Sequence, residues 1–522
     1  MGSINRKAKK RKLTETVVGL GDESLPTKTS NEETGLLAPV AVVTEQMKFF
    51  KKPEVGNGLL RSFNVYVDAQ CPLDITSDRD VIFNVPGNTT NLIDLQEIEL
   101  LMEIQIRKKG SIGKGNMFAN GPGDKTLITK NGLTFPECFI REANENADPP
   151  DDKEAEFVTP IDAFFHTQWE NIEIKLNDKT ITRTNNDQPY RSYIDLLLRT
   201  EDKDLPLCER KFLFTRNRGR KRKNDPHPYS SENIGAIKRS LRVRSRNIVQ
   251  LGGKIFTDFL KDPEILLVNG VSMFFRFSPA SNKFRFKVYP DELKDKFEYV
   301  IHSCKLKIPY VTLTDGALGG MTNYLKSQPV YYKYVETDMK ILPLHEGVRE
   351  VRIPEIFHKI VPIDVVFAMV DADSAYGAND KDPFYFNQNN IESLSFRLDN
   401  TSIPEEPLEF PEQESSIIPE DDHISERADE WQYRILESLW NVAGTTENGF
   451  NAYTYEDGQT LIAVKTDPTV PANVTHWPIP KGGNLSLHIR FRQAIPNEQQ
   501  LIVFARYPRT ITIDYKRKVK VW

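Results

Sequence analysis

Residues 172–182 read Ile172-Glu173-Ile174-Lys175-Leu176, Asn177-Asp178 and Lys179-Thr180-Ile181-Thr182. Apolar and polar side chains alternate there with a period of two, which is typical of a strand with one buried face. Asn177-Asp178 interrupts the alternation with residues that favour a tight turn. The stretch therefore predicts a β-hairpin, and the rest of the fold assignment extends from it.

The same alternation recurs along the chain. It is found in 63–67, 98–106, 300–308 and 485–491, and short apolar runs bounded by turn residues lie between these segments. Helical spacing marks two short patches, one after Pro189 and one ending at Leu439. Together these patterns predict an all-β protein made of two successive β blocks of about two hundred residues each.

Composition sets the predicted boundaries of these blocks. Residues 1–55 are polar and basic, which predicts a flexible N-terminal arm. The N-terminal block is assigned to 56–290 and the C-terminal block to 291–522. Stretches that lose the alternation are assigned as insertions, namely 107–156 and 200–250 in the first block and the acidic, proline-bearing 404–430 in the second.

Composition also limits the class of protein. The chain has 522 residues, a net charge of -5 and 39 % hydrophobic residues, so we expect a folded protein that is not a polycation. Four widely spaced cysteines without a CxxC pair argue against a disulfide framework or a zinc knuckle. No apolar run of about 18 residues exists, so no membrane-spanning helix is expected, and no secretory signal is evident.

Catalytic and metal-binding patterns are also not evident. The sequence has no Ser-His-Asp arrangement, Gly-rich phosphate loop or cysteine-nucleophile signature. Asp371 and Asp373 do not continue into the spacing of a calcium loop and are interpreted as a turn that bonds its own backbone. His302 and Cys304 lack further ligands and are interpreted as core or edge residues. We therefore predict that the protein is not an enzyme and uses no cofactor or metal.

Four segments carry a resemblance to a known family. They are Val81-Ile-Phe-Asn-Val-Pro-Gly87 followed by 91–95, Asn185-Asn-Asp-Gln-Pro-Tyr-Arg-Ser-Tyr-Ile194, Val370-Asp-Ala-Asp-Ser-Ala-Tyr-Gly377 followed by 382–384, and 483–514. In this order, over roughly residues 60–522, they resemble the major capsid proteins of Polinton (Maverick) elements and adintoviruses. Thr510 stands where the family pattern has Asn.

The resemblance implies two tandem eight-stranded jelly rolls, a double jelly roll, with short helices and long loop insertions. It also implies a homotrimeric, pseudo-hexameric capsomer that assembles into an icosahedral shell around double-stranded DNA. The expected partners are neighbouring capsomers and a minor or penton capsid protein. The expected location is the virion, after synthesis in the host cytoplasm, and import into the nucleus for assembly is left open.

Two basic runs are candidate contact sites. The arm carries Arg6, Lys7, Lys9, Lys10, Arg11 and Lys12, which fit either a nuclear-import signal or contacts with packaged DNA phosphates, while a solvated tail remains the plain alternative. Residues 209–246 contain thirteen Lys and Arg against three acids. Within them, a candidate inter-capsomer loop that would face the acidic 404–430 comprises Arg216, Arg218, Arg220, Lys221, Arg222 and Lys223.

A candidate maturation cleavage site lies in the arm. Related viruses carry a cysteine protease that favours a bulky residue, any residue, Gly, any residue and Gly. The stretch ending in Gly19, Leu20 and Gly21 comes close to that pattern, although Val17 replaces the preferred first residue.

Two other classes of function stay open at this stage. A tandem jelly-roll carbohydrate-binding or glycan-hydrolysing protein would need a cleft with exposed aromatic residues and paired carboxylates. A DNA-binding module would rest on the basic runs alone.

Overall fold

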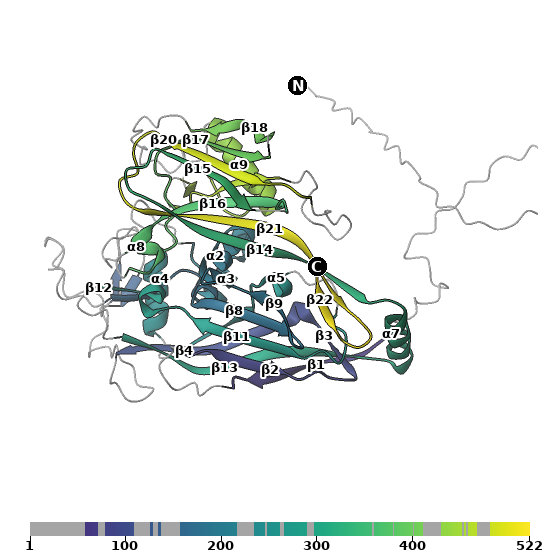
Figure 1. The fold of residues 1–522 in the computed structure, drawn as a ribbon. Helices are drawn as coiled ribbons and strands as arrows, with labels where there is room; N and C mark the ends of the chain where they lie inside the picture. Colours follow the sequence, from purple (N-terminus) through teal and green to yellow (C-terminus); the bar gives the residue numbers. More distant parts are fainter. Residues whose placement is uncertain are drawn as a thin grey trace, which may run out of the picture. The chain divides into compact units, whose positions relative to one another are not determined.

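The computed structural model describes residues 58–70, 79–108, 126–128, 134–136, 157–216, 234–245, 248–261, 266–289, 297–357, 360–378, 381–399, 401–410, 430–451, 454–455, 458–466 and 481–522 (Figure 1). They belong to one compact unit, Asn57–Trp522. The predicted N-terminal arm, with its candidate contact and cleavage residues, lies outside the described residues.

The N-terminal part of the unit contains one five-stranded and one four-stranded antiparallel sheet, which together we call the N-terminal roll. The first sheet has the order β1 (Leu59–Asp68), β13 (Phe297–Leu313), β4 (Glu99–Lys108) and β10 (Val249–Lys254), and β3 (Asn91–Ile93) pairs with β13. The second sheet has the order β2 (Val81–Val85), β11 (Met273–Pro279), β8 (Trp169–Leu176) and β9 (Lys179–Arg183). The hairpin predicted at 172–182 is β8–β9, and that prediction is confirmed.

The C-terminal part repeats this arrangement, and we call it the C-terminal roll. Its first sheet has the order β14 (Val330–Leu344), β21 (Gln499–Ile513), β16 (Asp364–Asp371) and β19 (Ile462–Lys465), and β22 (Val519–Val521) pairs with β21. Its second sheet has the order β15 (Glu350–Phe357), β20 (Leu485–Phe491), β17 (Ile391–Leu398) and β18 (Thr401–Glu409).

The two rolls share one connectivity. Numbered along the chain within each roll, the strands follow the orders 1-8-3-6 and 2-7-4-5 in the two sheets of both rolls. Eight strands in two facing antiparallel sheets with this crossed order form a jelly roll. The predicted fold class, a double jelly roll with short helices, is therefore confirmed.

One strand lies on the other side of the predicted boundary. The sequence boundary at 290/291 places 297–313 in the C-terminal block, but β13 is hydrogen-bonded to β1 and β4 of the N-terminal roll. The boundary is therefore one strand too early. The alternation in 300–308 specifies a strand with one buried face, but it carries no information about which strands lie beside it.

The connections contain more helix than the two patches that the sequence indicates. The predicted helices after Pro189 and around Ile435 are present as α2 (Gln188–Arg199) and α9 (Glu430–Ala443). The remaining helices are α1 (Phe164–Thr167), α3 (Leu205–Phe212), α4 (Ile234–Ser245), α5 (Asp258–Lys261), α6 (Asn282–Arg285), α7 (Asp315–Ser327), α8 (Ala372–Ala375) and the short 3-10 turns η2 (Leu95–Glu97) and η4 (Asp202–Asp204).

The described parts of the predicted insertions contain helices and strands. The stretch 200–250 holds α3 and α4 and runs into β10, and 404–430 begins inside β18. Two small sheets accompany the first roll. They are β7 (Phe157–Pro160) with β12 (Phe286–Tyr289), and β5 (Thr126–Ile128) with β6 (Thr134–Pro136), the latter within the predicted insertion 107–156.

The cores of the rolls differ in how far they extend. One apolar cluster fills the N-terminal roll and continues onto the C-terminal roll, where it includes Val366, Ile502 and Phe504. A second cluster lies between the two sheets of the C-terminal roll and includes Val365 and Val503. Neighbouring residues of β16 and β21 therefore point into different cores, so the first sheet of the C-terminal roll is buried on both faces. In Figure 1 this sheet lies between the rest of its own roll and helices α2 and α5.

Candidate functional site

The junction between the two rolls combines aromatic packing, hydrogen bonds and buried ion pairs. On the side of the N-terminal roll, Phe259 of α5 packs edge-on against Tyr332 and Tyr334 of β14, with ring centroids 6.4 and 6.0 Å apart. Arg191 of α2 donates to the backbone oxygen of Thr337 in the same strand. The two tyrosines and Phe259 are buried, so β14 is an edge strand covered by the other roll.

Aromatic side chains join the rolls at a second point. Phe384, between β16 and β17, stacks on Tyr193 of α2 with a centroid distance of 4.0 Å and an interplanar angle of 16°. Tyr190 and Phe284 approach the same ring edge-on at 5.6 and 6.0 Å. These four rings are buried, and stacked or edge-to-face pairs add to the free energy gained from burial alone. The two rolls therefore share a core here.

Charged groups are enclosed at the same junction. Arg191 pairs with Asp187 at 2.9 Å and with Asp258 at 3.6 Å, and Lys261 pairs with Asp195. Burial raises the pKa of the Asp258 carboxyl to about 6, although Arg191 and Lys261 act in the opposite direction. Burial lowers the pKa of the Lys261 ammonium to about 8. Removing one partner of such a buried pair strongly destabilises the fold, because the remaining charge is left buried without compensation. The cluster therefore holds helices α2 and α5 together.

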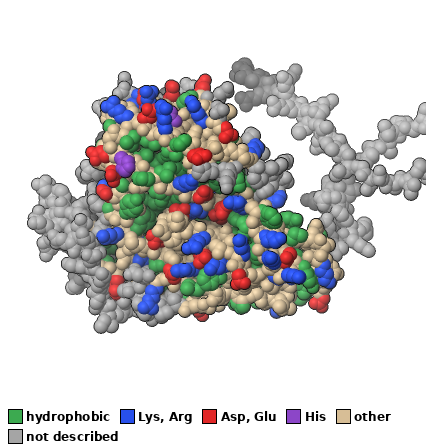
Figure 2. All heavy atoms as spheres, in the orientation of Figure 1, with side chains coloured by type: hydrophobic (Ala, Val, Ile, Leu, Met, Phe, Trp, Pro, Cys, Tyr) green, Lys and Arg blue, Asp and Glu red, His purple; other side chains and the backbone are tan. Residues whose placement is uncertain are grey.

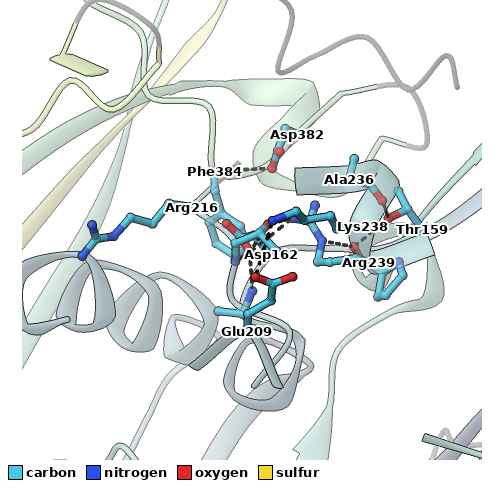
Figure 3. A network of polar contacts seen from close by, with 12 residues as sticks. Thr159, Asp162, Glu209, Arg216, Ala236, Lys238, Arg239, Asp382 and Phe384 are labelled. Carbon is cyan, nitrogen blue, oxygen red and sulfur yellow. Dashed lines mark hydrogen bonds and ion pairs between the residues drawn. The ribbon is translucent and has the colours of Figure 1, made fainter. Parts of the chain in front are cut away.

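A second polar network surrounds Asp162 (Figure 3). Its carboxylate accepts from the backbone N–H of Thr215 at 2.7 Å and of Ala163 at 3.0 Å, and Arg239 of α4 lies 3.2 Å away. Arg239 also donates to the backbone oxygen of Pro160 at 2.9 Å. Burial raises the pKa of the Asp162 carboxyl, while Arg239 and the two backbone donors act to lower it.

This network has the composition of a catalytic site but not the access. Asp162 is 0 % and Arg239 1 % exposed, so no substrate reaches them in this arrangement. Thr159 of β7 donates to the backbone oxygen of Ala236 at 2.9 Å, and Ser240 donates to that of Val158 at 2.8 Å. The network thus attaches α4 to the N-terminal roll.

Of the six residues of the candidate inter-capsomer loop, the structure describes Arg216. Its side chain is 2 % exposed and pairs with Asp202 at 2.5 Å, and its backbone oxygen accepts from Gln459 at 2.9 Å. Arg216 is therefore part of the roll junction and is not exposed in the single chain, whereas the predicted inter-capsomer contact assumes an exposed side chain. A run of basic residues does not show which of them finds a buried partner. Arg218, Arg220, Lys221, Arg222 and Lys223 lie outside the described residues.

The residues weighed for metal binding are engaged in other contacts. The Asp371 carboxylate accepts from the side chains of Asn387 at 3.0 Å and Gln499 at 2.6 Å, so it joins neighbouring segments and does not bond its own turn. His302 contacts the Gln105 side chain at 2.8 Å, and Cys304 is buried. Within the described ranges, no group of three or more His, Cys, Asp or Glu side chains is placed to hold a metal ion.

His166 lies in an aromatic pocket of the N-terminal roll. Its ring centroid is 4.8 Å from that of Phe165, 4.6 Å from Phe212 and 4.5 Å from Phe256. The side chain is buried, and burial lowers its pKa to about 3. In the part of the chain that the structure describes, Nε2 of His166 has no hydrogen-bond partner. The site therefore holds a neutral imidazole.

A glycan-hydrolysing site would need a hollow with exposed aromatic side chains and two facing carboxylates. A hollow of about 540 Å³ beside β14 and β22 carries the exposed aromatic residues Tyr331 and Trp522. Asp514 is the single acid among its lining residues, which otherwise include lysines and threonines. Hydrolysis by the usual route needs two facing carboxylates, so this hollow does not supply that chemistry.

The face drawn in Figure 2 differs between its two halves. Hydrophobic side chains gather in the middle of the upper half, over the C-terminal roll, and charged side chains of both signs lie above this patch and over the lower half. No described helix is long and apolar enough to span a membrane.

No protein-family model and no curated protein matches the sequence. Solved structures do match the fold. A chain in the cryo-electron-microscopy structure of the Sputnik virophage superposes with a TM-score of 0.55 and 10 % identity, over 93 % of this chain and 93 % of that one. The mavirus major capsid protein, seen in a crystal structure, is 10 % identical over 95 % of this chain and 97 % of that one, with a TM-score of 0.44. At these identities the Sputnik match establishes a shared fold that extends over both rolls.

Proposed function

We propose that the chain is a major capsid protein whose function is assembly and not catalysis. The observation that carries the proposal is the pair of identically connected jelly rolls joined by one continuous core, together with a fold match over 93 % of a chain of the Sputnik virophage particle. A rigid two-roll unit with its charged clusters enclosed is suited to be a building block whose contacts lie on its outer faces.

In this proposal three copies form a pseudo-hexameric capsomer, because three chains bring six similar rolls around one axis. Capsomers then tile an icosahedral shell that encloses double-stranded DNA, with a minor or penton capsid protein at special positions. The family resemblance in the four sequence segments supports a Polinton or adintovirus type. The basic arm would contact DNA or direct nuclear import, the candidate cleavage at Gly19, Leu20 and Gly21 would trim it, and the virion would be the final location.

The proposal is tested by expressing the full chain alone and imaging the purified material by electron microscopy. We expect particles of hexagonal outline, and closed shells when ionic conditions are varied, since assembly contacts at exposed charged rims depend on salt. Monodisperse monomers under every condition, and also with the other capsid components present, would contradict the proposal.

A further inference from the structure

The two rolls have matching strands whose surroundings differ sharply. β1 and β14 are each the first strand of a roll and the edge of the corresponding sheet. β14 is covered by the N-terminal roll, and its Tyr332 and Tyr334 are 3 and 4 % exposed. On β1, Leu60 is 67 % and Tyr66 54 % exposed. Among the described residues, β1 pairs with β13 and is covered on its outer face by no other strand.

The connecting helices show the converse difference. α2 joins the fifth and sixth strands of the N-terminal roll, and α9 joins the fifth and sixth strands of the C-terminal roll. α2 is buried around most of its circumference because the C-terminal roll lies against it. α9 buries Ile435 and Leu439 but leaves Tyr433 52 % exposed. Its next residue, Arg434, is paired only at 4.0 Å with exposed Glu406 among the ion pairs of the described chain.

If the junction inside one chain is repeated between chains, it is one half of the contacts in a ring. It joins the helix side of one roll to the sheet side of the next, which is a head-to-tail interface. Such an interface leaves one unused helix side and one unused sheet side, and repetition from chain to chain closes a ring when the rotation fits. One side of α9 packs on β19 and α2, so the exposed helix surface is its Tyr433 side. The exposed sheet surface is the outer face of β1 and β13.

We propose that a second copy of this chain docks its α9 face, centred on Tyr433, against the outer face of β1 and β13, centred on Tyr66. This inference rests on the proposed function, since it names the partner surface of the capsomer. The same contact in each copy would complete the ring.

The chemistry of the outer sheet face fits a contact between separately folded chains. Lys305 pairs with Asp68 at 3.4 Å and Lys307 with Glu99 at 3.0 Å, whereas the equivalent face of the C-terminal roll carries Ile502 and Ile511 at 0 % exposure. A polar face with exposed aromatic and aliphatic residues keeps the single chain soluble and still supplies contact points. The fully apolar face is the one that is buried in the junction within the chain.

The test uses two single variants of the full chain, Tyr66→Asp and Tyr433→Asp, with Tyr376→Asp as the matched control. Tyr376 is 76 % exposed on the C-terminal roll and outside both proposed faces. Sedimentation velocity at micromolar concentration measures association, and thermal unfolding verifies that each variant folds. We expect each test variant to weaken association by at least about tenfold, because a desolvated charge at an interface centre is costly, and the control to associate as the wild type.

Mixing the two variants separates this geometry from a general surface effect. Tyr66→Asp keeps an intact α9 face and Tyr433→Asp keeps an intact β1 face, so an equimolar mixture regains one intact interface. We expect one-to-one complexes in the mixture that neither variant forms alone. Wild-type association that persists unchanged in both variants would overturn this inference but leave the proposed function standing, whereas a wild type that never associates would overturn both.

The same variants also distinguish a second copy from another segment of the same chain as the group that contacts β1. If residues 1–56 of the same chain occupied the edge, Tyr66→Asp would lower the melting temperature of the monomer, and Tyr433→Asp would leave association unchanged. That result would also overturn the inference.

Discussion

His166 makes the N-terminal roll sensitive to acid, and the size of the effect follows from its burial. The pKa of this imidazole falls from 6.5 to about 3 in the folded chain because the aromatic pocket desolvates it. Below pH 6.5 the imidazole is protonated in the unfolded chain but stays neutral in the folded chain. The contribution of His166 to the free energy of unfolding is therefore complete above the unfolded pKa and is lost as the pH falls towards the folded pKa. Between pH 7 and pH 5 the loss amounts to about 2 kcal/mol.

The loss of unfolding free energy at pH 5 depends almost entirely on the pKa of the histidine in the unfolded chain. Any folded value well below 5 gives nearly the same loss, because the folded histidine is then neutral throughout the interval. Asp258 acts in the opposite direction over the same interval, since its raised pKa of about 6 makes its protonation favour the folded chain. The contribution of His166 must therefore be isolated by comparison with variants that cannot titrate.

His166→Phe and His166→Leu serve this purpose, since both fill an apolar pocket without a titrating group. The free energy of unfolding is measured by urea titration at pH 7 and pH 5 with tryptophan fluorescence as the signal. We expect both variants to lose about 2 kcal/mol less than the wild type between the two pH values, whatever their absolute stabilities. His345→Phe, at a side chain that is 77 % exposed, is the control and should retain the wild-type loss. Equal losses in the wild type and both His166 variants would refute the reasoning.

Three further predictions concern the junction. The raised pKa of Asp258 lowers the free energy of unfolding by about 2 kcal/mol as the pH rises from 4 to 6, so Asp258→Asn should gain about 2 kcal/mol relative to the wild type over that rise; urea titration at both pH values measures the difference. Phe384→Ala should cost about 3–5 kcal/mol through the lost stack on Tyr193 and should increase proteolytic cleavage between the rolls, whereas a cost below 1 kcal/mol would contradict the shared core. Arg216→Ala should lower the free energy of unfolding by about 1–3 kcal/mol and leave shell assembly unchanged, so an assembly defect in a stably folded variant would restore the exposed-contact interpretation.

The hairpin at 172–182 and the two amphipathic helices were predictable because their signals are local. The alternation in 172–182 and the spacing after Pro189 follow directly from side-chain geometry. The pairing of β13 was not predictable from its own residues, because the partners β1 and β4 are brought together only by the complete roll. Sequence resemblance gave the jelly-roll connectivity that periodicity alone leaves open.

The roll junction was missed, although two signals for it are present. Val365–Val370 and Leu501–Ala505 are continuous apolar runs and do not alternate, which indicates strands buried on both faces. Asp187 and Arg191 stand four residues apart on one helix, as an ion pair would. The third member, Asp258, is distant in sequence, so the cluster itself could not have been assembled without the fold.

The most direct test of the central claim is the mass of the purified chain in solution, measured by mass photometry. The capsid proposal predicts a dominant species near three times 59.9 kDa, with larger assemblies appearing as ionic conditions change. A stable species at 59.9 kDa that never associates, alone or with the other capsid components, would contradict it.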